Sequence, residues 1–564
     1  MNQIRTTLLL ATLAVAYLLW TAWNKDYAPP PASPAPAAAA STEHAPSAAV
    51  PAAAPVAAGS ASAAPGQLID VSTDVLKLQI DTRGGSLVHA ELLDYAVAPR
   101  TRKDPDPAPT VLLTTKPDWY FVAQDGLVSS SDPAAADQPD HRALFSAAQT
   151  SYALAPGQDT LVVALSWHDA AGLKVVKTYT FKRGSYVIGV RQQIDNGSAQ
   201  AWQGNPYRQL QRVEPPQPSG WLQSFSHPES RSFQGAAWYD GEKFDKLSYK
   251  DYAKPRDQLD AQIKGGWAAM LRLYFFAAWI PPADETDHYA TAMIDPEGAH
   301  PRYLIRAVGP AISVPAGGSA STDSRLYVGP NLQGKLDAIA PGLDLTIDYG
   351  MLKAIAVPMH WVLSQLCALV RNWGVAIILL VLLIKGATWK LTAVQYRSGA
   401  AMRKLQPRVQ ALKERYGDDK VKLQQAMMEL YKKEKVNPMG GCLPMLITMP
   451  VFYGLYYVLS YSLELRHAAF LWIPDLSAPD PYYILPGIYA IVMLATQWLN
   501  PAAAGMDPTQ AKMMKILPLV FTVMFAFFPA GLCLYYAVNG LVGLSQQWWI
   551  LRSVERKDLA VKAG

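Results

Sequence analysis

The sequence predicts a multi-domain membrane protein that combines an α-helical membrane core, a large periplasmic β-sandwich and a cytoplasmic helical hairpin. Half of the 564 residues are hydrophobic and only 17% are charged, less than the usual quarter of a soluble protein. Long apolar runs fill the C-terminal part of the chain, and short alternating runs with turn residues precede them. A further apolar run opens the chain. These three observations predict the architecture.

The charge and cysteine content exclude several classes. A net charge of +5 is too small to indicate nucleic-acid specificity. The three cysteines, Cys367, Cys442 and Cys533, lie in apolar C-terminal segments, and their spacing forms neither a disulfide framework nor a zinc pattern. We therefore expect no metal and no cofactor.

The N-terminal segment, residues 1–27, is predicted to be a transmembrane anchor. Its apolar run covers residues 6–23, about enough to cross a bilayer. The alternative is a cleaved signal peptide, but the run ends on Trp20 and Trp23 and lacks a small-residue cleavage site after it. Residues 28–66 are almost entirely Ala, Pro and Ser, which predicts an extended linker. Both interpretations place the following region outside the cytoplasm.

Residues 67–350 are predicted to form the β-sandwich. In the stretch VLKLQI, Leu76, Leu78 and Ile80 alternate with polar residues, and an RGGS turn follows. Residues 174–197 read as two strands around a turn at Arg183-Gly184. Long helical periodicity is scarce in this region, so a large sandwich is the natural architecture.

The periodicity becomes helical at Met351. Residues 351–372 predict an amphipathic helix lying in the membrane interface, with His360 on its polar face. Residues 373–564 predict the membrane core. Together with the anchor, its apolar segments 373–394, 442–463, 481–499, 516–528 and 532–551 make six predicted spans.

The loops orient these spans. Residues 397–437 carry eleven basic residues, and the tail 552–564 is mildly basic. In residues 464–480, by contrast, the single Lys or Arg is Arg466. The positive-inside rule then predicts an inner-membrane protein with both termini in the cytoplasm and the sandwich in the periplasm. Within residues 397–437, apolar residues recur every three or four positions on both sides of Gly417, which predicts a helical hairpin. This hairpin is either a docking or gating element or a solvated structural loop beside anionic lipid.

Lys385 interrupts an apolar run, IILLVLLIKGATWKLT, and has no acidic residue nearby in sequence. A continuous helix over residues 373–394 would be about 33 Å long and would place Lys385 well inside the hydrocarbon. A lysine there costs roughly 2.5–3.5 kcal/mol on insertion scales. A water-filled cavity open to the cytoplasm removes most of that cost, and the alternative is a snorkelled lysine without a functional role.

Several motifs carry a resemblance to the YidC/Oxa1/Alb3 membrane insertase family, in its Gram-negative YidC branch. They are NPMGGCLPMLITMP (437–450), DPYYILP (480–486), FPAGLCLYY (528–536), NWG (372–374) and LQP (405–407). In the outer region, KTYTFKRGSY (177–186), GGWAAMLRLYFFAAWIPP (265–282) and YVGPNLQGKLD (327–337) resemble the periplasmic domain of that branch. The resemblance covers nearly the whole chain apart from the linker.

The resemblance implies a membrane protein insertase and chaperone that transfers newly made transmembrane segments from the cytoplasm into the inner membrane, alone or with the Sec translocon. The family carries an arginine in a hydrophilic groove, and Lys385 takes that position here. We expect the groove to be lined by Lys385, Tyr535, Tyr536 and Asn539, and an apolar slide for the client to be formed by Met445, Met449, Phe452, Met524 and Phe528. For the slide residues the alternative is ordinary helix packing, and for the tyrosines and Asn539 it is hydrogen bonding between helices.

The expected partners are nascent membrane proteins, the Sec translocon and the lipid bilayer, with the ribosome and the signal recognition particle receptor as candidates for the 397–437 hairpin. A secondary transporter is a rival class, but it predicts two symmetric repeats, which the sequence lacks. An envelope sugar enzyme is a second rival, because the family's outer domain resembles a mutarotase-like sandwich. Carbohydrate enzymes need placed carboxylates, but the acidic residues of this chain's outer region, such as Asp240, are scattered among basic ones, as on a solvated surface. A likeness of fold alone does not transfer chemistry. We therefore expect no enzymatic activity.

Overall fold

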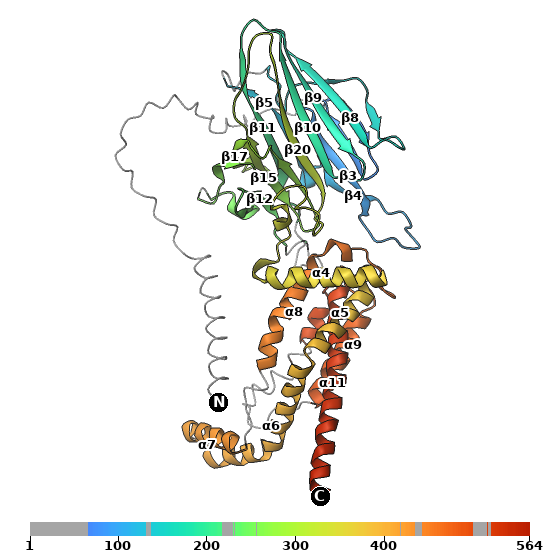
Figure 1. Ribbon diagram of the computed structural model, residues 1–564, viewed down its shortest axis with the longest axis vertical. Coiled ribbons are helices and arrows are strands. Elements are labelled where there is room, and N and C mark those ends of the chain that lie inside the picture. The colour runs from blue at the N-terminus through green and yellow to red at the C-terminus, as the bar shows by residue number, and fades with distance from the viewer. Residues whose placement is uncertain are drawn as a thin grey trace, which may run out of the picture. The chain divides into compact units, whose positions relative to one another are not determined.

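The computed structural model describes residues 66–130, 137–216, 229, 232–254, 256–417, 419–434, 443–499, 516 and 520–563 (Figure 1). The predicted anchor at 1–27 and almost all of the linker at 28–66 lie outside these residues. Within the described residues, strands fill the chain up to Pro330 and helices dominate after it.

Two antiparallel-rich sheets form a β-sandwich, as predicted. The first sheet contains β1 (Leu68–Ser72), β2 (Leu76–Asp81), β3 (Ser86–Ala96), β4 (Pro109–Leu113), β5 (Phe121–Ser129), β7 (Ser151–Ala153), β11 (Trp202–Val213), β14 (Asp260–Lys264), β17 (Thr286–Ile294), β18 (Arg302–Val308) and β19 (Ile312–Val314). The second sheet contains β6 (Ser146–Ala147), β8 (Thr160–His168), β9 (Leu173–Lys182), β10 (Val187–Asn196), β12 (Gly235–Tyr239), β13 (Phe244–Ser248), β15 (Trp267–Leu271), β16 (Phe275–Ile280) and β20 (Ser319–Pro330). The long strands β9, β10 and β20 lie side by side in the second sheet (Figure 1).

The sandwich core follows the alternation in the sequence. Leu76, Leu78 and Ile80 are fully buried in one continuous cluster with residues of the opposite sheet, such as Val163 and Val175. The predicted RGGS turn separates β2 from β3. Gly84 has a φ of +72° there, and a Cβ atom on it would lie 2.4 Å from the backbone of His141. Only glycine fits this position.

The predicted turn at Arg183-Gly184 is confirmed, because β9 and β10 pair as an antiparallel hairpin around it. Gly184 has a φ of +67°, and its backbone N–H donates to Asp74. The two strands therefore change direction at the residues where the sequence predicts the turn.

The described helices of the C-terminal region are α4 (Lys353–Val370), α5 (Trp373–Ala387), α6 (Trp389–Tyr416), α7 (Lys420–Lys433), α8 (Leu443–Tyr461), α9 (Ile484–Leu499) and α11 (Ala530–Ala563). In this part of the chain α11 packs against α5, α6 and α9, and α4 packs against α5 and α8. In Figure 1, α4 runs across the direction that α5, α8 and α11 share. A second buried cluster joins these helices through residues such as Ile377, Leu455 and Leu532.

Among the described helices, α4 passes by itself a test of length and apolar composition for crossing a membrane, and α5 with α6 pass together as a bent pair. On α4, Ala356 and Leu363 are fully buried, while Trp361 and Leu369 are 63% and 78% exposed. The interfacial position of residues 351–372 and the total of six spans stay predictions.

The hairpin segment contains two helices. Leu405 and Val409 form the buried stripe of α6. Asp419 caps α7 by accepting from the backbone N–H of Lys422 at 3.0 Å. The helix that enters the hairpin begins already at Trp389, so α6 continues from the predicted span without a loop.

Candidate functional site

Lys385 lies in the last turn of α5. The prediction of one continuous helix over residues 373–394 is wrong, because α5 ends at Ala387 and the axis of α6 is bent by 66° from that of α5. Thr388 closes the end, since its hydroxyl donates to the carbonyl of Ile384 at 2.8 Å. Apolar residues continue past the bend, so hydropathy alone does not reveal it. Lys385 is therefore close to a helix end.

The amino group of Lys385 faces α11. A Cβ atom on Gly543 would lie 3.4 Å from Lys385 Nζ and 3.8 Å from the hydroxyl oxygen of Tyr396. The Tyr396 hydroxyl itself donates to the carbonyl of Gly543 at 3.3 Å. Glycine thus leaves the space in which a cation from α5 and a phenol from α6 meet α11. Across the described part of the chain, no carboxylate forms an ion pair with Lys385.

The other predicted groove residues lie on α11. Tyr535 and Tyr536 are buried, and Asn539 is half-buried. The ring of Tyr536 packs against Phe452 of α8, with 5.0 Å between ring centroids, and against Phe525 at 4.5 Å. Both tyrosines therefore belong to an aromatic cluster on the α11 face that carries Gly543 two turns later.

The predicted slide residues divide between the surface and this cluster. Met449 is 41% exposed on α8, and Phe452 and Met524 are half-buried. Phe528 is buried, with its ring centroid 5.3 Å from that of Phe525. The backbone of Met445 belongs to α8, and its side chain lies outside the described residues.

Two buried glutamines on α11 are not among the residues predicted from the sequence to line the groove. Gln546 is 5% exposed and Gln547 is fully buried. Both follow Gly543 on the same helix face, one turn later. The signal was available, because a pair of amides interrupts the apolar segment 532–551.

At the opposite end of the bundle, residues 463–483 form a cap, which the DPYYILP motif enters and the FPAGLCLYY motif contacts. Asp480 accepts from the backbone N–H of Leu485 at 2.7 Å, which fixes the start of α9. The turn before α11 binds the same cap, because Gly531 N–H donates to the carbonyl of Leu476 at 2.8 Å and Ala530 N–H to that of Ala478 at 2.7 Å. These contacts close this end of the bundle.

The comparisons with known proteins cover the same regions. The family model for the YidC periplasmic domain matches residues 68–362, and that for the 60Kd inner membrane protein matches residues 365–557. The membrane protein insertase YidC of Thioalkalivibrio sulfidiphilus is 44% identical over 99% of this chain and 99% of its own. That of Stenotrophomonas maltophilia is 46% identical over 98% of this chain and 97% of its own. The chain belongs to the YidC family of membrane protein insertases.

Membership of the YidC family confirms the resemblance and the insertase function expected from the motifs. A crystal structure of an active YidC insertase aligns with 86% of this chain and with 92% of the solved chain. The sequence identity is 19% and the TM-score is 0.36. The YidC motifs now have local explanations in the fold. In NWG, for example, Asn372 caps α5 by accepting from Val375 N–H at 3.0 Å.

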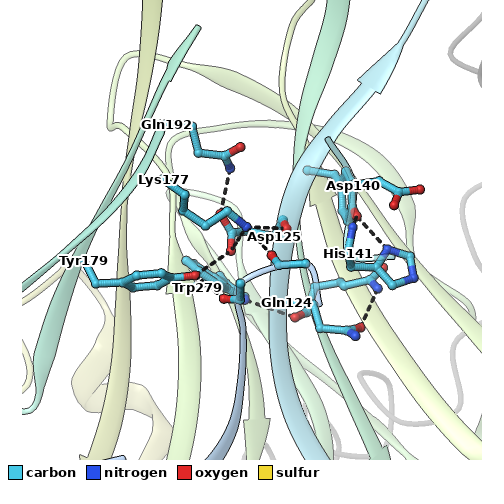
Figure 2. A network of polar contacts seen from close by, with 12 residues as sticks. Gln124, Asp125, Asp140, His141, Lys177, Tyr179, Gln192 and Trp279 are labelled. Atoms are coloured by element: carbon cyan, nitrogen blue, oxygen red, sulfur yellow. Dashed lines mark hydrogen bonds and ion pairs between the residues drawn. The ribbon is translucent and has the colours of Figure 1, made fainter. Parts of the chain in front are cut away.

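The sandwich of this YidC-family chain contains a buried polar network that links its two sheets (Figure 2). Lys177 of β9 points at Asp125 of β5, with Nζ 3.0 Å from Oδ1. Gln192 of β10 donates to the other oxygen, Oδ2, at 2.6 Å. Burial lowers the pKa of the Lys177 amine, and Asp125 opposes that shift. Because the network is closed to solvent, we interpret it as a structural link between the two sheets and not as a second functional site.

Metal binding finds no support in the described residues, where no group of three or more His, Cys, Asp and Glu side chains is placed to hold an ion. The polar groups that meet at Gly543 are the Lys385 amine and the Tyr396 phenol, which do not form a carboxylate or thiolate ligand set. What this arrangement offers is a fixed positive charge and hydrogen-bonding groups beside apolar helix faces.

Proposed function

We propose that this chain transfers newly synthesised transmembrane segments from the cytoplasm into the inner membrane along a polar groove at Lys385. The observation that carries the proposal is the position of the Lys385 amine, at the meeting of α5, α6 and α11 without a carboxylate partner among the described residues. A cation left without a counter-ion inside a helix bundle attracts an acidic group from outside it. A client with a short acidic tail supplies that group.

Lys385 acts by simple electrostatic attraction. Lysine provides a compact charge on a flexible stem, whereas the arginine that the family resemblance implies at this position provides a planar fork for a carboxylate. We propose that acidic client tails are drawn in by the charge without a bidentate salt bridge. The positive charge then offsets part of the cost of moving a carboxylate through hydrocarbon.

The apolar part of the client needs a separate surface. The exposed Met449 and Tyr453 on α8 offer one, and Met524 lies on the segment before α11. Methionine is unbranched and adaptable, so it can contact unrelated client sequences. We propose these residues as the slide, with Phe452 and Phe528 supporting it from the aromatic cluster.

We further propose the topology and the division into domains that the sequence predicts. The 1–27 anchor, the 373–564 core and the interfacial helix at 351–372 hold the chain in the inner membrane, with both termini in the cytoplasm and the sandwich in the periplasm. The 397–437 hairpin, whose basic side chains include the exposed Arg408, would meet the ribosome or the signal recognition particle receptor. The Sec translocon is the proposed membrane partner. The chain catalyses no chemical reaction in this proposal.

A charge-reversal series at Lys385 tests the proposed groove. The full chain is reconstituted into vesicles of phosphatidylethanolamine and phosphatidylglycerol, and insertion of a single-span client with an acidic outer tail is measured by protease protection. We expect Lys385→Met to reduce insertion about tenfold or more, because the attraction that offsets roughly 2 kcal/mol of transfer cost is lost. Lys385→Arg should retain insertion of the acidic client, because arginine keeps the positive charge.

Lys390→Met is the matched control, since Lys390 is an exposed lysine early in α6 and loses the same charge. If Lys385→Met inserts the acidic client as well as Lys390→Met does, the groove at Lys385 is not the route.

A further inference from the structure

The two glutamines on α11 have side-chain amide atoms without hydrogen-bond partners among the described residues. Gln547 is fully buried, and both its Oε1 and Nε2 atoms are without a hydrogen bond among the described residues. Gln546 is 5% exposed, and its Oε1 also lacks a partner in that set. A buried amide without partners costs about 1–3 kcal/mol. A helix would gain stability from leucine at either position, so the amides indicate a partner that arrives from elsewhere.

Two contacts between α6 and α11 bracket Gln547. Tyr396 meets Gly543 on one side of it along α11, and the ring of Trp389 packs against that of Trp549 on the other side, with 5.5 Å between centroids. The two helices therefore run antiparallel here. Gln547 lies between these two contacts along α11, about 6 Å along the helix axis from Gly543.

Gly543 also meets Lys385, the cation among the predicted groove residues. Lys385 Nζ reaches the position that a side chain on Gly543 would occupy. A polar chain passing Lys385 along α11 would thus meet Gln547 within one turn.

We propose that Gln547 binds the peptide backbone of the client's polar segment as that segment passes Lys385, with Gln546 as its neighbour. This rests on the proposed groove. A primary amide offers a donor and an acceptor that match those of a peptide group. Each backbone group of an unfolded segment needs such a partner inside a membrane. A lipid acyl chain has no hydrogen-bonding groups and would leave the amides unpaired.

In this proposal, two side chains recognise different parts of the client's polar segment. Lys385 recognises acidic residues, whereas Gln547 recognises the backbone whatever the side chains are. Clients whose outer tails are polar but uncharged should therefore depend on Gln547 more than on Lys385.

Gln547→Leu tests this in the full chain, reconstituted into vesicles of phosphatidylethanolamine and phosphatidylglycerol. One client has a short outer tail of Ser, Asn and Gln, and a matched client has aspartates added to that tail. We expect Gln547→Leu to lower insertion of the uncharged client about two- to tenfold, the effect of one net hydrogen bond. The acidic client should be less affected. The thermal midpoint of the protein should stay the same or rise, because an unpaired buried amide is removed.

Ser545→Ala is the control, since Ser545 is exposed on α11 and its hydroxyl donates to Leu541 of the same helix. Unchanged insertion of the uncharged client by Gln547→Leu would overturn the proposal. So would a lower thermal midpoint, which would mean that Gln547 has a structural partner; Gln546→Leu repeats the test at the second amide. Wild-type vesicles that insert no more than empty ones would instead contradict the groove itself.

Discussion

At the residue scale, Lys177 shows how this sandwich tolerates a fully buried charge. Its Nζ donates to the carbonyls of Gly84 at 2.7 Å and Asp125 at 2.9 Å, as well as to the Asp125 carboxylate. All three donors of the ammonium group are therefore used. The contacts join β9 to β5 and to the turn before β3, so the ion pair fixes how the two sheets face each other (Figure 2).

We predict that Lys177→Met lowers the free energy of unfolding of the sandwich by about 3–5 kcal/mol, because the Asp125 carboxylate stays buried without its counter-ion. Urea unfolding followed by near-UV circular dichroism measures this. Lys77→Met is the control, since the Lys77 side chain is 55% exposed and should change stability by well under about 1 kcal/mol. Equal effects of the two variants would contradict the assigned role of Lys177.

A buried arginine of the sandwich, Arg208, contacts two carboxyl groups at once. Arg208 Nη1 lies 2.9 Å from Asp287 Oδ2 and 3.1 Å from Glu285 Oε1. Burial raises the pKa of Asp287 to about 7, with Glu285 adding to the shift and Arg208 opposing it. One guanidinium cannot neutralise both carboxylates in a dry site, so Asp287 retains a proton that an exposed aspartate would release.

This shift predicts a pH dependence of stability. Between about pH 4 and pH 7 the folded state holds the Asp287 proton while the unfolded chain has lost it. The free energy of unfolding should therefore fall as the pH rises through this window. Asp287→Asn should flatten the fall in urea unfolding curves taken across the window, whereas Asp106→Asn, at an exposed position, should leave it unchanged. A slope that survives Asp287→Asn would assign the proton to another group.

At the element scale, the start of α5 depends on one close approach. A Cβ atom on Gly374 would lie 2.2 Å from the ring of Phe470, which belongs to the 463–483 cap. The neighbouring Asn372 both caps the helix and donates from its side-chain nitrogen to Ala469 at 3.4 Å. The NWG motif therefore places α5 against the cap, and glycine is needed for space rather than for a turn.

Gly374→Ala should destabilise the helical region by about 1–3 kcal/mol, because the added methyl group overpacks the contact with Phe470. The thermal midpoint of the detergent-solubilised chain measures the effect. Gly386→Ala in the same helix is the matched control: apart from its chain neighbours and the helix's own backbone, no atom of the described residues lies within 4 Å of its Cβ position. It should stabilise α5 by about 0.5–1 kcal/mol. Loss of stability in both variants would mean that helix α5 responds to alanine at any position.

At the scale of the whole molecule, the cap also contacts the sandwich. Arg466 donates from Nη1 to the carbonyl of Ala96 at 2.8 Å and from Nη2 to that of Val97 at 3.3 Å. Its guanidinium group lies over the ring of Phe275, 5.5 Å from the centroid. Leu463 belongs to the buried cluster of the sandwich core. The only basic residue of the 464–480 loop is thus used inside the protein.

Arg466→Ala should loosen this contact. We expect faster hydrogen exchange around Ala96 in β3 and Phe275 in β16, while β9 and β10 stay protected. Arg466→Lys should give an intermediate result, because lysine keeps the charge but lacks the planar fork that serves two carbonyls. Unchanged exchange in Arg466→Ala would show that Leu463 and its apolar neighbours hold the contact alone.

The β-sandwich, the helical C-terminal region and the family could all be predicted from the amino-acid sequence alone. Alternation places Leu76, Leu78 and Ile80 inside, and that pattern depends only on the period of a strand. Turn residues such as Gly184 likewise act through their own backbone, and the motifs identify the family because they are read directly from the chain. These properties are local, so they can be predicted without knowing which residues pack nearby in the fold.

The tertiary structure decided what surrounds the polar side chains. Lys385 meets Gly543, Phe470 meets Gly374, and Gln547 is fully buried on α11. Each partner is far away in sequence. A hydropathy average covers only a short window of residues, and the partner lies outside that window. The break between α5 and α6 was missed for a related reason, since Thr388 ends the helix within an otherwise apolar run. Burial and pairing are properties of packing, and only the folded chain brings these residues together.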